Sequence, residues 1–130
     1  MIVYYCLAIA MLIPIILALS SIPFRVKQLS AVNLNEPRAQ AEQLAGAGAR
    51  LVAAQKNAWE GLILFAVSIF IADANGVNPD ELATAGLVFI TARIGHAIFY
   101  VAGLGVLRFI TFIIAIGAVG SIVSLGLLAS

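Results

Sequence analysis

The stretch MIVYYCLAIAMLIPIILALSSI, residues 1–22, contains no charged side chain, and neither does FITFIIAIGAVGSIVSLGLLAS, residues 109–130. Two further apolar stretches lie between them. Residues 51–72 are interrupted only by Lys56 and Glu60, and residues 82–107 only by Arg93 and His96. A helix needs about 20 mostly apolar residues to cross a bilayer, so each stretch is long enough to do so.

The sequence therefore predicts an all-α integral membrane protein, a four-helix bundle in a single transmembrane domain that covers residues 1–130. The four helices are expected at approximately 1–22, 51–72, 82–103 and 107–129. The first stretch also resembles a secretory signal peptide, because Ala18-Leu19-Ser20 has the pattern of a cleavage site. It lacks the usual basic start and is longer than the usual apolar region, so cleavage remains only an alternative.

Composition excludes several classes of protein. Of the 130 residues, 63% are hydrophobic and 10% are charged. In a typical soluble domain about half of the residues are apolar and about a quarter are charged. So small a soluble globule has too little interior to bury this apolar surface. A net charge of +1 gives no field that attracts nucleic acid, so we expect no nucleic-acid partner. One cysteine and one histidine leave no plausible metal site.

The basic residues of the connections predict the orientation in the membrane. The polar loop 23–50 contains Arg25, Lys27, Arg38 and Arg50, and Arg108 follows a short turn between the last two spans. The connection from 73 to 81 is acidic instead. Because basic loops stay in the cytoplasm, we expect the 23–50 loop to be cytoplasmic and both termini to lie outside.

Polar side chains inside the second and third spans form two stripes. Asn57 and Glu60 share one face of the second helix, and Arg93, His96 and Tyr100 share one face of the third. With a rise of 1.5 Å per residue, Glu60 lies about 13 Å deep and Arg93 about 15 Å deep. A charge near the bilayer centre costs about 2.5–3.5 kcal/mol. We therefore predict a Glu60–Arg93 ion pair, which serves a functional site or only holds the helices together.

Two segments carry a resemblance to a known family. They are Ala54-Gln55-Lys56-Asn57-Ala58-Trp59-Glu60 and Arg93-Ile94-Gly95-His96-Ala97-Ile98-Phe99-Tyr100. Together with four spans and a long first loop, they resemble the MAPEG family, the membrane-associated proteins in eicosanoid and glutathione metabolism. Asn35-Glu36-Pro37-Arg38 resembles bacterial members.

The resemblance implies a homotrimer that binds glutathione, its co-substrate, at each subunit boundary. It implies that Arg108 is catalytic and stabilises the glutathione thiolate, since an arginine and a helix N-terminus both lower the pKa of a thiol. Arg25 approaches from the neighbouring subunit. Family members commonly have an arginine where this chain has Ala53, and we expect Arg50, one turn earlier on the same face, to substitute for it. The other implied glutathione-binding residues are Gln55, Asn57, Glu60, Arg93, His96 and Tyr100.

The function implied by the resemblance is that of a membrane-embedded, glutathione-dependent transferase or peroxidase-like protein acting on lipophilic electrophiles. Its expected partners are copies of itself, membrane lipid and a lipophilic small molecule, and its expected location is the bacterial cytoplasmic membrane. Ala53 leaves open a non-catalytic family member that binds lipid or a partner. A third hypothesis is a small proton-coupled exporter that uses Glu60.

Overall fold

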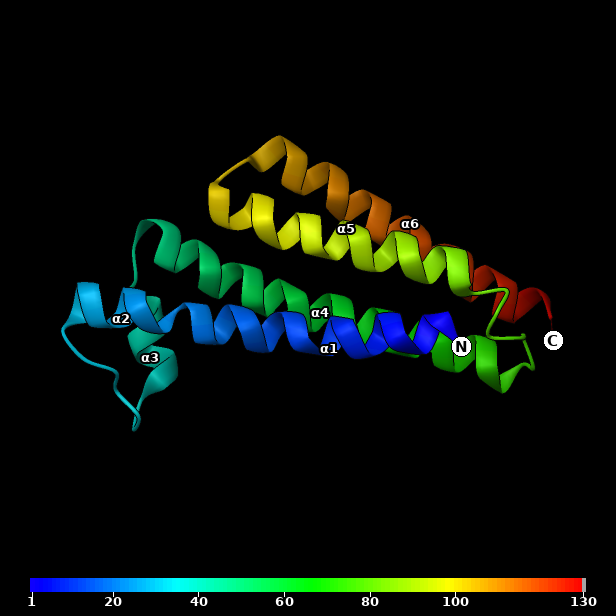
Figure 1. The fold of residues 1–130 in the computed structure, drawn as a ribbon, viewed down its shortest axis with the longest axis horizontal. Helices are drawn as coiled ribbons and strands as arrows, with labels where there is room; N and C mark the ends of the chain where they lie inside the picture. Colours follow the sequence, from blue (N-terminus) through cyan, green and yellow to red (C-terminus); the bar gives the residue numbers. More distant parts are fainter. Residues whose placement is uncertain (130) are drawn as a thin grey trace.

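The computed structural model describes residues 1–129, and these fold into helices joined by short connections. The helices are α1 (Ile2–Ser20), α2 (Ile22–Leu29), α3 (Pro37–Glu42), α4 (Gly46–Ala74), α5 (Ala83–Ala102) and α6 (Gly105–Leu128). Four of them lie side by side, and α2 and α3 lie at one end (Figure 1). Four helices, the first being α1 and α2 taken together, are long and apolar enough to cross a membrane. The predicted all-α architecture with four membrane-crossing helices is confirmed.

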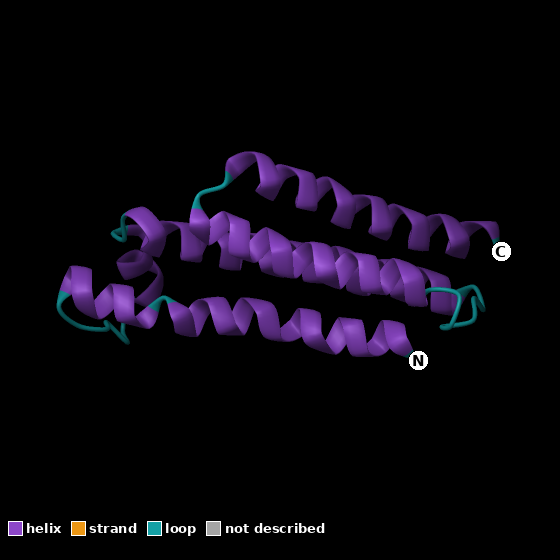
Figure 2. Cartoon of the chain, turned by 45° about the horizontal axis from the view of Figure 1, so that its top comes forward, coloured by secondary structure: helices purple, strands orange, loops and turns teal. Residues whose placement is uncertain are grey.

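The two ends of the bundle differ in what they contain. One end, which we call the loop end, holds α2, α3 and the turn between α5 and α6 (Figure 2). The opposite end holds the start of α1, the connection between α4 and α5, and the end of α6. The basic residues that predict the orientation therefore gather at the loop end.

Much of the charged segment 23–50 is helical rather than extended. The backbone of α1 continues almost without interruption into α2, and it turns sharply at Ser30, where φ is 67°. The side chain of Arg25 in α2 then joins α2 to α3 by hydrogen bonds. Its Nη1 donates to the carbonyl oxygen of Pro37 at 2.7 Å and to Oε1 of Gln40 at 3.1 Å. These bonds hold α3 against the end of α2.

Small residues bring the helices close together at the end opposite the loops. A Cβ added to Gly126 of α6 would lie 2.9 Å from Cα of Ala72 in α4. A Cβ added to Gly86 of α5 would lie 3.2 Å from a methyl carbon of Val3 in α1. The rings of Phe65 of α4 and Phe89 of α5 stack with their centroids 4.0 Å apart. Small residues and this ring pair therefore pack the four long helices closely in this part of the bundle.

A glycine turn reverses the chain between α5 and α6. Gly103 adopts a φ of +77°, which side chains disfavour, and the N–H of Leu104 donates to the carbonyl of Phe99 at 2.9 Å. Arg50 of α4 donates from Nε to the carbonyl of Val101 at 2.8 Å. This bond fixes the end of α5 to α4. The turn also brings Arg108 back beside the last residues of α5.

Candidate functional site

The candidate site begins at the contact between α4 and α5. Arg93 is only 4% exposed, and its Nη2 donates to two oxygens of Asn57, the backbone carbonyl at 2.7 Å and Oδ1 at 2.9 Å. Two donations to one residue fix the guanidinium in place. The polar stripes of the two helices therefore meet, although Arg93 bonds to Asn57 and not to Glu60, whose calculated depth is closer to its own.

The predicted Glu60–Arg93 ion pair is wrong. Oε2 of Glu60 instead accepts a hydrogen bond from Nδ2 of Asn57 at 3.3 Å. Within residues 1–129 the only ion pair joins the N-terminal ammonium of Met1 to Asp80, at the opposite end of the bundle. Asn57 thus bridges the two charged side chains, because its amide accepts from Arg93 and donates to Glu60.

Gly61 explains why Arg93 reaches Asn57 rather than Glu60. A Cβ at Gly61 would lie 2.8 Å from both Cζ and Nε of Arg93, closer than such atoms approach. The missing side chain therefore leaves the space in which the guanidinium lies against α4. Sequence reasoning missed Gly61, although its position four residues after Asn57 places it on the face that Arg93 contacts.

His96 is held in one orientation by the backbone of α6. It is 4% exposed, and its Nδ1 lies 3.0 Å from the carbonyl oxygen of Arg108. A carbonyl only accepts, so Nδ1 carries the hydrogen and a neutral ring leaves Nε2 as an acceptor. Nε2 is buried and has no hydrogen-bond partner within residues 1–129. The His96 ring therefore has one acceptor, Nε2, without a partner among the described residues, and Arg93 and Arg108 are the charged residues near it.

Tyr100 connects His96 to the side chain of Arg108. The Cζ atom of Arg108 lies 4.4 Å from the centroid of the Tyr100 ring, a cation–π geometry. The rings of His96 and Tyr100 meet edge to face with centroids 5.6 Å apart. The structure thus gathers six of the predicted residues from three helices into what we call the polar cluster: Asn57, Glu60, Arg93, His96, Tyr100 and Arg108.

The other three predicted residues lie elsewhere in the chain. Arg25 and Gln55 line a recess of about 420 Å³ between α2, α3 and α4, together with Arg38, Lys56 and Trp59. Gln55 and Asn57 are two residues apart, about 200° around the helix, so this recess opens on the other side of α4. Arg50 lies at the end of α5, bonded to Val101.

A single chain does not enclose a ligand at the polar cluster. The cavity lined by Asn57, Glu60 and Arg93 has a volume of about 140 Å³, below the roughly 300–1,000 Å³ of typical small-molecule sites. Glu60 is exposed on the surface of α4. Among residues 1–129, no group of His, Cys, Asp and Glu side chains could hold a metal ion. The cluster is therefore an open polar face rather than a closed pocket.

Comparison with known proteins identifies the family. A search of curated proteins finds no match. The model of the MAPEG family matches residues 2–128, which include all six helices and the whole polar cluster. Members of this family are membrane proteins generally associated with glutathione. The chain therefore belongs to the MAPEG family.

Proposed function

We propose that this protein is a glutathione-dependent membrane transferase or peroxidase-like protein that acts on lipophilic electrophiles. The observation that carries the proposal is the exposed carboxylate of Glu60, hydrogen-bonded to Asn57 beside the buried Arg93. A carboxylate exposed to lipid deep in a membrane is costly. This face of α4 therefore requires a polar ligand, a second protein surface, or both.

The exposed side of α4 supports self-association. One row of its exposed side chains recurs at alternating intervals of four and three residues, at Lys56, Glu60, Ile63, Val67 and Phe70, and the exposed Trp59 and Leu64 lie beside this row. This spacing of 3.5 residues is the pattern of helices that pack in parallel along a shared seam. We propose that α4 packs against α4 of neighbouring copies, and that the assembly is the homotrimer which the family resemblance implies.

A closed ring of copies would complete the polar cluster. In such a ring, one side of each subunit meets the opposite side of the next. The recess that holds Arg25 and Gln55 then faces the Glu60 side of a neighbour. In the proposed site, glutathione lies between two copies. Asn57 and Glu60 of one copy bind its amino group and polar backbone. Arg25 and Gln55 contact it from the other subunit.

Arg108 is proposed to act on the sulfur of glutathione. It is a permanent cation in the first turns of α6, held over Tyr100, and both features favour a thiolate over a thiol. The thiol proton passes to water, and the thiolate sulfur bonds to an electrophilic carbon of a molecule that arrives from the lipid. As this bond forms, the bond from that carbon to a leaving group, or the π bond of an activated alkene, breaks, and its electron pair moves to the leaving group or to the far carbon, which takes up a proton from water. Arg93, His96 and Tyr100 line the site from α5. The loop end is proposed to face the cytoplasm, because it carries the basic connections.

Equilibrium binding of glutathione to detergent-purified protein tests the proposal. We expect saturable binding at millimolar glutathione. Glu60→Gln and Arg108→Ala should each weaken it by about tenfold or more, the value of one hydrogen bond to a charged group. Glu81→Gln, an exposed carboxyl change at the opposite end, is the matched control. Absence of saturable binding to the wild-type protein would refute the proposal.

A second candidate function is a non-catalytic member that keeps the fold. It is favoured by the hydrogen bonds of Asn57, because both polar atoms of its side chain already have partners within the chain. Oδ1 accepts from Arg93 and Nδ2 donates to Glu60. The cluster is thus satisfied partly within one chain, as residues that only join helices are. Glutathione binding without turnover of electrophiles or lipid hydroperoxides would favour this function.

A further inference from the structure

We propose that the groove between α1 and α5 binds one acyl chain of an acidic phospholipid, and that Arg50 at its mouth holds the phosphate. The groove has a volume of about 520 Å³. This inference does not depend on glutathione chemistry, because it does not use the polar cluster, and it rests on the proposed function only for the side of α4 through which copies associate.

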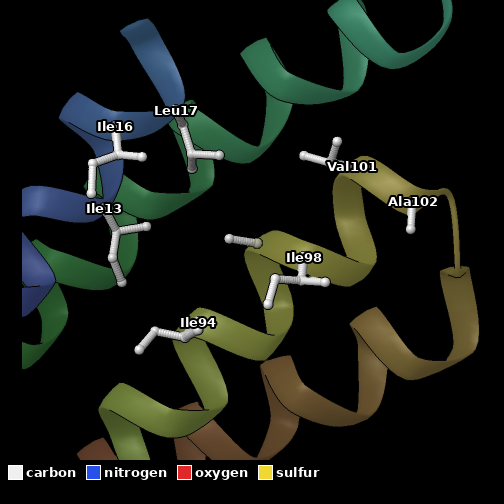
Figure 3. A pocket seen from close by; sticks show the side chains of 8 residues that line it. Ile13, Ile16, Leu17, Ile94, Ile98, Val101 and Ala102 are labelled. Atoms are coloured by element: carbon white, nitrogen blue, oxygen red, sulfur yellow. The ribbon is translucent and has the colours of Figure 1, made fainter. Parts of the chain in front are cut away.

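The lining of the groove is entirely apolar. In Figure 3, residues of α1 face residues of α5 across the gap. None of the lining side chains carries an oxygen or nitrogen atom, so the groove offers nothing to water or to a peptide. They are Ile13, Ile16, Leu17, Ile94, Ala97, Ile98, Val101 and Ala102.

The groove opens toward the loop end of the bundle. At the opposite end α1 and α5 touch, because Gly86 lets Val3 approach closely. Toward the loop end the two helices separate (Figure 1), and the groove lies beside their last turns, from Ile94 to Ala102 and from Ile13 to Leu17. It is thus narrow toward the bundle centre and open where lipid headgroups lie, which suits an acyl chain that inserts from one leaflet.

A second copy of the chain is not the expected occupant. Figure 3 shows α4 behind the groove, and Ile16 and Ile98, which line it, are 58% and 60% exposed, so the groove is open to the surroundings of the bundle. The α4 side chains directed toward the bundle include the buried Ala54, Ala58 and Phe65, about 180° around the helix from the exposed seam. Self-association through the seam therefore leaves the groove in contact with lipid.

Arg50 supplies the charge at the mouth. Its Nε donates to the carbonyl of Val101 at 2.8 Å, and its Cζ would lie 3.6 Å from a Cβ at Gly103. These two residues flank Ala102, the last lining residue. Within residues 1–129 the terminal nitrogens of Arg50 have no hydrogen-bond acceptor, and their planar arrangement matches two oxygens of a phosphate. A net negative headgroup is favoured because the loop end is basic.

Native mass spectrometry of the purified protein with phosphatidylglycerol or phosphatidylcholine of identical acyl chains tests the inference. We expect the wild-type protein to retain phosphatidylglycerol at least about tenfold more strongly. Arg50→Gln should abolish this preference, while the control Lys27→Gln, at an exposed basic residue of the loop end, should keep it. Equal retention of the two lipids by the wild-type protein, or a preference that survives Arg50→Gln, would overturn the inference.

Filling the groove provides a separate test. Ala102 is exposed and lines the mouth, so Ala102→Phe should expel the chain and lower retention of both lipids. Ile113→Phe, at an exposed position of α6 outside the groove, should not. If Ala102→Phe does not fold, phosphatidylglycerol with a photoreactive acyl chain decides the matter in the wild-type protein. Adducts on Ile94 or Ile98 support the inference, and adducts only on other residues refute it.

Discussion

The guanidinium of Arg93 lies against the backbone of Gly61, where a Cβ would come within 2.8 Å of its Cζ and Nε. Gly61→Ala should therefore displace Arg93 from Asn57 while leaving the helix intact, since alanine favours a helix by about 1 kcal/mol over glycine. We expect unchanged helix content by circular dichroism and glutathione binding weakened by about tenfold. Gly117→Ala, where a Cβ meets nothing within 4 Å, should leave binding unchanged. Equal affinities in the two variants would contradict this role of Gly61.

A different glycine controls stability rather than the site. A Cβ at Gly126 would meet Cα and N of Ala72 at 2.9 and 3.0 Å, and backbone atoms cannot move aside as a side chain can. Gly126→Ala should destabilise the protein by about 1–3 kcal/mol, as overpacking does, and so lower the temperature of unfolding in detergent. Gly120→Ala, with nothing within 4 Å, is the control and should not lower it.

The orientation of His96 predicts its tautomer. Because Nδ1 faces the carbonyl oxygen of Arg108 at 3.0 Å, the hydrogen should be on Nδ1 and Nε2 should be unprotonated. The chain has one histidine, so ¹⁵N NMR of histidine-labelled protein reports this ring without ambiguity. Nitrogen shifts typical of the Nε2–H tautomer would show that the bond to Arg108 is absent.

The ring of Tyr100, rather than its hydroxyl, should position Arg108. The cation–π contact uses the ring face, so Tyr100→Phe should keep it and Tyr100→Leu should lose it, at a cost of about 0.5–2 kcal/mol. We expect glutathione affinity to be nearly unchanged in the first variant and about threefold to thirtyfold lower in the second. A loss of affinity in Tyr100→Phe equal to that in Tyr100→Leu would assign the role to the hydroxyl instead.

The sequence predicts the bundle well because charge marks the spans so clearly. Residues 1–22 and 109–130 contain no charge, and a chain this apolar has no soluble alternative. Depth arithmetic correctly predicts that the polar stripes of α4 and α5 meet, but it pairs Arg93 with Glu60, whereas Arg93 bonds to Asn57, about one turn nearer the loop end. The choice of partner for Arg93 could not be predicted, because it depends on the space above Gly61 that appears only when two helices pack.

The remaining site residues show a second limit of the sequence. The family motif places Gln55 beside Asn57 in a single site, but two residues on a helix face different directions. In one chain, Gln55 and Arg25 therefore line a separate recess. The family motif therefore indicates residues that meet when copies assemble, whereas helical geometry shows that one chain alone does not bring Gln55 and Asn57 to the same site.

The glycine contacts at the end opposite the loops have a consequence for motion. Gly126 against Ala72 and Gly86 against Val3 hold the helices close together at that end. We therefore expect any opening of the bundle to be larger at the other end, near Tyr100 and Arg108, so that molecules arriving from the membrane would enter there.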